Sequence, residues 1–233
     1  MLDSLIVEHR RTDHQFTVYR SGDQPALETW LANHGAATES RPLPPGGPDP
    51  FIEVKTDGEV VGVIGVNAVE RLLEPPVVSL GDRDDISKGY EVLFKALEKT
   101  VFSGMHRRDL LAVSREIEDR AFRIGEGTLR VCFQTLSMFT SQTDVYRTLA
   151  TETALDIHIH GVEDWTPPAI TGITYHTKAA EQFEPYWALA YDGGPDEAYA
   201  CGLVAQEDSD EYTGFWTNES AIVEEIATTL RTG

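Results

Sequence analysis

The sequence predicts an α+β protein, in which two β-rich portions of similar element order surround a central helical pair. Apolar and polar residues alternate, as in half-buried strands, both before residue 106 and after residue 151. Between these portions, over residues 107–150, apolar residues recur at helical spacing. Each β-rich portion also contains an Asp-Gly pair, a strong hairpin signal, at Asp57-Gly58 and at Asp192-Gly193. These observations favour one compact unit over residues 1–233.

The N-terminal portion, residues 1–106, is expected to mix helices with strands. Pro25 opens a short helix that stops at Gly35, and the proline-rich stretch 42–50 must be a loop. The expected elements, in order, are a helix carrying Leu2, Leu5, Ile6 and His9, a strand over 15–19, a helix over 25–35, a hairpin of strands 51–55 and 59–66, a brief helix from Asn67 to Pro75, and a helix carrying Tyr90, Leu93, Phe94, Leu97 and Val101.

The central segment, residues 107–150, predicts two helices separated by Gly125-Glu126-Gly127. The first has one face formed by Leu110, Ser114, Ile117, Ala121 and Ile124. The second is expected to carry a coiled-coil-like seam, in which Leu129, Cys132, Leu136, Phe139, Thr143, Tyr146 and Ala150 alternate three and four residues apart.

The C-terminal portion, residues 151–233, returns to a β pattern. Strands are expected over 155–160, 170–175, 186–191, 198–205 and 212–216, and Asn218 caps a closing helix with Ile222, Ile226 and Leu230 on its face. The hairpin around Asp192-Gly193 parallels the one around Asp57-Gly58 in its flanking residues, since Tyr186-Trp187 and Gly202 correspond to Phe51-Ile52 and Gly62. A duplicated architecture is therefore a hypothesis.

The charge is distributed unevenly along the chain. The three segments carry net charges of −7 over 1–106, +1 over 107–150 and −14 over 151–233, for a total of −20. All seven bases of the central segment are arginines, which pair with carboxylates and phosphates through two parallel hydrogen bonds. The central segment is therefore expected to serve as a scaffold of internal ion pairs, a subunit contact or an anion site.

The overall acidity, with only five lysines, is typical of a protein from a high-salt cytoplasm, where salt screens the self-repulsion. The absence of a basic stripe argues against nucleic-acid binding. No apolar stretch approaches a membrane span, and no signal peptide is expected at the N-terminus. Cys132 and Cys201 lack metal-type spacing, so free thiols are expected. These features predict a cytoplasmic protein of a halophile.

Several segments resemble the DICT sensory domain, most closely its haloarchaeal stand-alone members. The longest is 102–136 (FSGMHRRDLLAVSREIEDRAFRIGEGTLRVCFQTL), and the others are 17–19, 43–48 with Phe51, 145–150, 156–161 and 214–217, so that the resemblance covers nearly the whole chain. It implies a non-catalytic sensory module associated with diguanylate cyclases, two-component proteins and responses to light or stress. It supplies no ligand, cofactor or active-site residue.

The function predicted from these observations is that of a non-enzymatic sensory or regulatory protein that acts through protein contacts. An enzyme with a dispersed site and a purely structural dimerising protein are the alternatives. A homodimer with contacts in 107–150 is expected, because this segment alone lacks excess negative charge. A signalling partner protein is also expected; its identity, the signal and any cofactor are not indicated.

The candidate ligand-binding residues are of two kinds. Arginines of the central segment are the best anion-binding candidates, although pairing with Glu116, Glu118 and Asp119 is the simpler role. Aromatic residues of the C-terminal strands are candidates for lining a pocket, although core packing is the commoner role. The set is Arg115, Arg120, Arg123, Trp187, Tyr191 and Trp216.

Three further patterns are weaker. His158, His160 and His176 could form a three-histidine metal site, but ordinary histidines are favoured because no carboxylate or cysteine stands at supporting spacing. Gly125-Glu126-Gly127 follows a helix rather than a strand, which disfavours a dinucleotide site. His106 begins a helix as in histidine kinases, but an arginine follows where the kinase motif has an acid. None of the three patterns therefore assigns a metal ligand or a catalytic residue.

Overall fold

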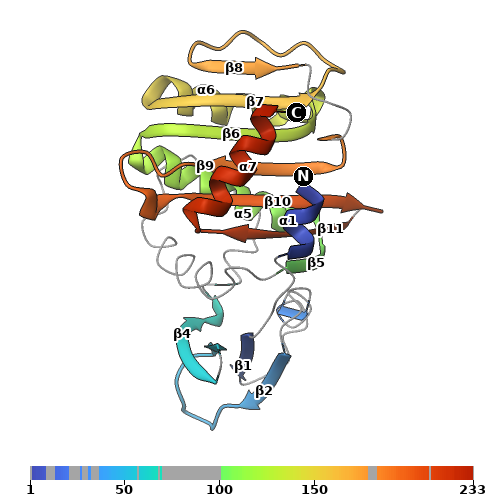
Figure 1. The fold of residues 1–233 in the computed structure, drawn as a ribbon. Coiled ribbons are helices and arrows are strands. Elements are labelled where there is room, and N and C mark those ends of the chain that lie inside the picture. The colour runs from blue at the N-terminus through green and yellow to red at the C-terminus, as the bar shows by residue number, and fades with distance from the viewer. Residues whose placement is uncertain are drawn as a thin grey trace.

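The computed structural model describes residues 2–8, 14–20, 27, 31–32, 37–56, 58–67, 69, 101–177, 183–209 and 211–232. Over these residues the chain forms two mixed β-sheets with helices, which confirms the predicted α+β class (Figure 1). None of the described helices is long and apolar enough to cross a membrane.

The smaller sheet is built from the N-terminal portion. Its strands, in the order β2-β1-β3-β4, are Ala37–Pro42, His14–Arg20, Phe51–Thr56 and Glu59–Gly65. Strand β1 runs parallel to β2 and antiparallel to β3, and β3 and β4 form an antiparallel pair. Gly58 adopts a φ of 83° between β3 and β4, so the predicted hairpin is confirmed.

The larger sheet has seven strands in the order β5-β11-β10-β9-β6-β7-β8. In chain order they are β5 (Val101–Met105), β6 (Glu126–Thr135), β7 (Ala154–Val162), β8 (Ile173–His176), β9 (Tyr186–Tyr191), β10 (Cys201–Asp208) and β11 (Glu211–Thr217). Strands β6, β7 and β8 are parallel, whereas β9, β10, β11 and β5 continue the sheet by antiparallel pairing.

Helices cover both faces of the larger sheet (Figure 1). One face packs against α5 (Arg107–Ile124), the 3-10 helix η1 (Leu136–Gln142) and α6 (Thr143–Glu152). The other packs against α1 (Leu2–Glu8) and α7 (Ser220–Thr232). Strand alternation divides the side chains between the two cores, so that Leu203 of β10 belongs to the α5 side and Val204 to the α7 side.

The strand topology supports the hypothesis of a duplicated architecture. Strands β7-β6-β9-β10 of the larger sheet repeat the order and the directions of β2-β1-β3-β4. The two Asp-Gly pairs occupy corresponding connections, after β3 and after β9.

The predicted second central helix is wrong in its first half. Residues 126–135 form strand β6, and only η1 and α6 follow as helices. Gly125, at φ 78°, ends α5 in the left-handed conformation and sends the chain directly into the strand. Leu129, Val131 and Phe133 alternate as in a strand, whereas Leu129, Cys132 and Leu136 recur at helical spacing. Pairing with β7 and β9 decided between the two patterns. The coiled-coil-like seam therefore does not exist, and Phe139 is fully buried beside Phe133 and Tyr146.

Other boundaries also differ from the prediction. Strand β2 was not predicted, and its last residue, Pro42, was expected to begin a loop. Strand β5 begins at Val101, which was expected to end a helix. Strand β8 begins at Ile173, and β10 begins at Cys201, after the 3-10 turn η3 (Glu197–Tyr199). Helix α7 begins at Ser220, so Asn218 lies before the cap position. Most of the helices predicted over 25–35 and 67–101 lies outside the described residues.

Candidate functional site

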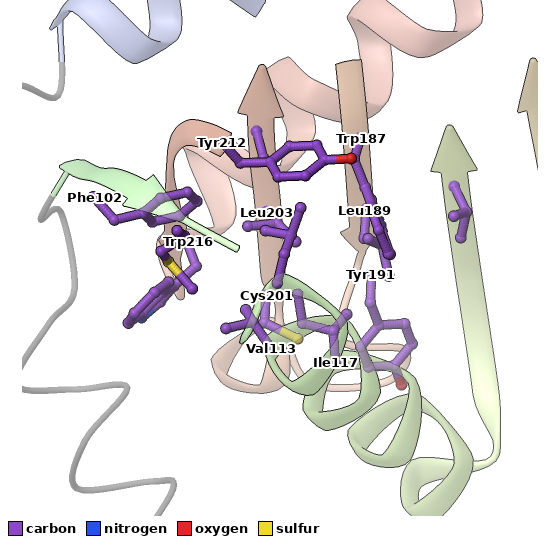
Figure 2. Packing of buried hydrophobic residues seen from close by; sticks show 14 of the residues in the cluster. Phe102, Val113, Ile117, Trp187, Leu189, Tyr191, Cys201, Leu203, Tyr212 and Trp216 are labelled. Carbon is purple, nitrogen blue, oxygen red and sulfur yellow. The ribbon is translucent and has the colours of Figure 1, made fainter. Parts of the chain in front are cut away.

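All six predicted ligand-binding residues lie where α5 meets the larger sheet. The three arginines are on α5, and the three aromatic residues, Trp187, Tyr191 and Trp216, are on β9 and β11. Figure 2 shows these aromatic side chains around Val113 and Ile117 of α5, within one buried cluster. The residues are distributed along the helix, however, and do not converge on a single point.

Two arginines of α5, Arg115 and Arg123, form ion pairs with acids of the same helix. Glu116, Glu118 and Asp119 are each only 2% exposed. Arg115 forms an ion pair with Glu118, and Arg123 forms ion pairs with Asp119 and, at 3.4 Å, with Glu116. Spacings of three and four residues place these partners side by side on the helix. For Arg115 and Arg123, the structure shows the simpler role that was weighed, pairing with the neighbouring acids.

The buried charges also connect α5 to other elements. The Tyr146 hydroxyl of α6 donates a 2.6 Å hydrogen bond to Glu118, and Arg115 donates to Gln142 at the end of η1. Arg120 donates a 2.8 Å hydrogen bond to Asn218, just before α7. The acids, the arginines and these partners constitute what we call the α5 ion network. Through it, α5 is linked to α6 and to the residues just before α7.

Glu116 is the least satisfied member of the α5 ion network. Its Oε2 atom is buried without a hydrogen-bond partner among the described residues. Burial raises the pKa of this carboxyl, and the positive charges of Arg123 and Arg120 oppose the shift. A buried acid so placed makes the network sensitive to the position of its two arginines.

The aromatic residues serve chiefly as core. Trp216 is 1% exposed and stacks against Phe102 at 5.8 Å between ring centroids. The Tyr191 hydroxyl donates a 2.8 Å hydrogen bond to the carbonyl oxygen of Glu126, which ties β9 to the start of β6. Trp187 differs from these two, because a charged side chain covers its ring.

That charged side chain belongs to Arg107, the first residue of α5. Its guanidinium carbon lies 5.4 Å from the centre of the Trp187 ring, and both of its terminal nitrogens lie 3.8 Å from the sulfur of Met138. Trp187 packs edge-on against Tyr212 at 6.2 Å, and Figure 2 shows the Tyr212 hydroxyl ending beside it. We call Arg107, Gln134, Trp187, Glu207 and Tyr212 the α5 amino-end cluster.

Gln134 contributes backbone strain to this cluster. It has a φ of 65°, a conformation that residues other than glycine seldom adopt. Its side chain, 5% exposed, donates a 2.6 Å hydrogen bond to the Glu207 carboxylate of β10. Such strain persists only where its surroundings enforce it, and it is concentrated at functional sites.

The three histidines do come together, on β7 and β8. His158 lies within hydrogen-bonding distance of His176 at 2.9 Å and of Asp156 at 3.0 Å, and the rings of His160 and His176 stack 4.2 Å apart. Within the described part of the chain, no group of His, Cys, Asp or Glu side chains is arranged to hold a metal ion. His160 is buried, and Arg130 adds to the desolvation that lowers its pKa to about 3.

The two cysteines are free, as predicted, and both are buried. Burial raises the pKa of Cys132 to about 12 and that of Cys201 to about 11. Both side chains therefore remain protonated thiols near neutral pH.

The α5 amino-end cluster was missed by the sequence analysis. Its partners come from positions 107, 134, 187, 207 and 212, and their proximity depends on the antiparallel order β11-β10-β9-β6. The available signal was the basic run His106-Arg107-Arg108, which was weighed only as a degenerate kinase motif.

Comparisons with known proteins identify one family. The model of the DICT domain, described as a sensory domain in diguanylate cyclases and two-component systems, matches residues 90–208. The match includes β5 through β10 and leaves the smaller sheet outside, so it is shorter than the resemblance inferred from the sequence.

No curated protein matches the sequence. Among solved structures, a polyphosphate kinase from Porphyromonas gingivalis matches with 12% identity and a TM-score of 0.38. That match covers 99% of this chain, which spans about half (47%) of the kinase.

Proposed function

The chain belongs to the DICT family of sensory domains, and on that premise we propose that it is a non-catalytic sensory protein in which α5 responds to the signal. The observation that carries the proposal is that the matched segment contains all of α5, with the acids and arginines of the α5 ion network. It also contains every member of the α5 amino-end cluster except Tyr212. The output would pass through protein contacts, as expected from the sequence.

The α5 ion network suits a switching element. Buried charges are stable only while they are paired, so a network of this kind has a few discrete arrangements rather than a continuous range. Because its members hydrogen-bond to α6 and to Asn218, a shift of α5 would alter two separate parts of the surface.

The chemistry of the described residues favours sensing over catalysis. Neither cysteine is suited to act as a nucleophile, because burial raises the pKa of each thiol. The buried acids of α5 are paired with arginines or with a tyrosine, and no nucleophile lies hydrogen-bonded to a general base beside them.

Self-association through residues 107–150 stays a prediction, but the surface that would make the contact differs from the one expected. Its expected helical seam is buried in the core, so a contact would have to use the exposed side of α5 or α6. Light scattering of the purified chain in high salt tests it, and a monomer would end the idea. A high-salt cytoplasm as the setting of the protein also stays a proposal, which rests on the net charge of −20.

A genetic experiment tests the sensory role. A strain that lacks the gene should lose part of its transcriptional response to light or to oxidative stress. Wild-type protein should restore the response, and Glu118→Gln, which disrupts the α5 ion network, should not. The matched control is Asp144→Asn, which removes an exposed acid of α6. An unchanged response in the deletion strain would refute the proposal.

A biochemical experiment tests the absence of catalysis. Purified protein incubated with labelled ATP or GTP and magnesium should form neither a cyclic product nor an acid-labile phosphoprotein. Phosphorylation that disappears in His106→Gln would contradict the non-enzyme assignment. Phosphorylation that requires an added partner kinase would leave that assignment standing and indicate a phosphorelay.

A further inference from the structure

The amino end of α5 carries two basic side chains, those of Arg107 and Arg108. Among the described residues, Arg107 and Arg108 form no ion pair, whereas Arg115 and Arg123 on the same helix do. Both Arg107 and Arg108 are exposed, in a chain with a net charge of −20. His106, at the N-cap position, provides no side-chain hydrogen bond to the first turn of this 18-residue helix. The first-turn N–H groups and the helix dipole add to the positive charge of the arginines.

Two buried hydrogen-bond donors lie beside this end of the helix without partners. Tyr212 is 1% exposed and Trp187 5%. The Tyr212 hydroxyl and the Trp187 Nε1 atom have no hydrogen-bond partner within bonding distance among the described residues, although Glu207 and Arg107 lie close to the Tyr212 hydroxyl. Tyr212 pairs in register with Met105, two residues before α5 begins, and Arg107 lies over the Trp187 ring. Unpartnered donors buried this deeply are rare, because each loses its hydrogen bonds to water.

We propose that this place, formed by Arg107, Arg108, the first turn of α5, Trp187 and Tyr212, binds a phosphate-type oxyanion. All of these groups are donors, and together they offer more hydrogen bonds than the two oxygens of a carboxylate accept. A phosphate group presents three or four oxygens in a tetrahedral arrangement and suits a helix N-terminus flanked by arginine. The site would bind inorganic phosphate or the phosphate group of a small metabolite.

Arg107 also provides the route of access. Its exposed side chain covers Trp187 only through contacts with the ring and with the Met138 sulfur, both weaker than an ion pair. The guanidinium turns from the ring to the anion, and this movement opens Trp187 and Tyr212 to the same ligand. Glu207 lies nearby, and the hydrogen bond from Gln134 offsets part of its negative charge.

The inference deepens the proposed function, because it assigns the class of signal that α5 would detect. It nevertheless has an independent test. Isothermal titration calorimetry on the full chain, at one fixed KCl concentration, compares inorganic phosphate, AMP and acetate up to about 20 mM each. Phosphate or AMP should bind at least tenfold more tightly than acetate, and the tighter of the two identifies free phosphate or a phosphate ester as the ligand.

Variants locate the site. Arg107→Gln should weaken binding about ten- to hundredfold, since a hydrogen bond from a charged donor is lost. Tyr212→Phe retains the ring, removes only the hydroxyl, and should weaken binding several-fold. The control is Arg147→Gln on α6, an exposed arginine that already pairs with Asp144; its affinity should equal that of the wild type. Thermal melts establish that each variant is folded.

Three results would overturn the inference. They are no binding of phosphate or AMP by the wild type, acetate binding as tightly as phosphate, and equal loss of affinity in Arg107→Gln and Arg147→Gln. A wild-type chain that does not bind phosphate, together with a deletion strain that loses its response, would reject the anion site and leave the sensory function intact.

Discussion

Acidification should destabilise the protein through His160. This imidazole is 2% exposed and stacks on His176 with 6° between the ring planes. Burial, and next the positive charges of His176, Arg130 and His158, lower its pKa from 6.5 to about 3. Because the folded-state pKa is depressed, the folded chain favours the neutral ring. This contribution to stability is complete above pH 6.5 and is lost as the pH falls from 6.5 toward 3.

The magnitude follows from the width of that interval. At about pH 4.5, an unfolded histidine has been protonated over roughly two pH units, while the folded one is still neutral. Each unit corresponds to about 1.4 kcal/mol, so the wild type should lose about 2–3 kcal/mol of unfolding free energy through this residue. That is a substantial part of the ~5–15 kcal/mol typical of a folded protein.

The assay compares the wild type with His160→Phe, which preserves a stacked ring and cannot be protonated. Unfolding free energies are measured by urea denaturation in a fixed high concentration of KCl, at neutral pH and at about pH 4.5. Any constant packing cost of the larger ring cancels when the two pH values are subtracted. The variant should lose about 2–3 kcal/mol less than the wild type. His106→Gln, at an exposed position, is the control and should follow the wild type.

A difference between the wild type and His160→Phe that is the same at both pH values would refute the reasoning. It would mean that His160 takes up its proton with little more difficulty in the folded chain than in the unfolded one. The neighbouring rings would then adapt to the charge instead of opposing it.

Three other perturbations probe the rest of the structure. Raising KCl from about 0.1 to 2 M should raise the melting temperature steeply, because salt screens the −20 charge; a flat or falling value contradicts the high-salt origin. Glu118→Gln should lower the free energy of unfolding by about 3 kcal/mol, because its partner Arg115 stays buried without a counter-ion. Asp144→Asn, whose side chain is 95% exposed, should lower it by less than about 1 kcal/mol. Equal losses in the two variants would contradict the buried network. Gly214→Ala should abolish folding or lower the free energy of unfolding by more than about 3 kcal/mol, because a Cβ would lie 2.0 Å from a backbone carbonyl oxygen of β10. Gly65→Ala, with open space around it, is the control in the same chemical denaturation series.

The sequence predicted best where two signals agreed. In α5 the apolar face coincides with a glycine at the left-handed C-cap, and in the β3–β4 hairpin the alternation coincides with an Asp-Gly turn. It failed where two periods overlapped. In β6, the alternating residues that face α5 are Leu129, Val131 and Phe133. The same segment also fits a helix through Leu129, Cys132 and Leu136, so pairing with neighbouring strands decided between strand and helix.

The candidate site shows the same limit. The arginines of the central segment and their acid partners were predictable, because three- and four-residue spacing alone brings them together. The α5 amino-end cluster was not predictable, because it depends on strand order and on a bulge that shifts β6 between Cys132 and Thr135, next to Gln134. Neither the order of strands nor a left-handed glutamine has a reliable signature in a single sequence.

The packing of α1 has a consequence for biosynthesis. This helix buries Leu2, Leu5 and Ile6 against β10, β11 and α7, and its Asp3 accepts a hydrogen bond from Tyr186, 183 residues later. A ribosome therefore makes α1 long before its binding surface exists. Until the final strands and α7 leave the exit tunnel, the apolar face of α1 is open to trigger-factor-like chaperones and to other nascent chains. The large sheet is consequently completed only once β11 has been synthesised, when β5 also finds its distant partner.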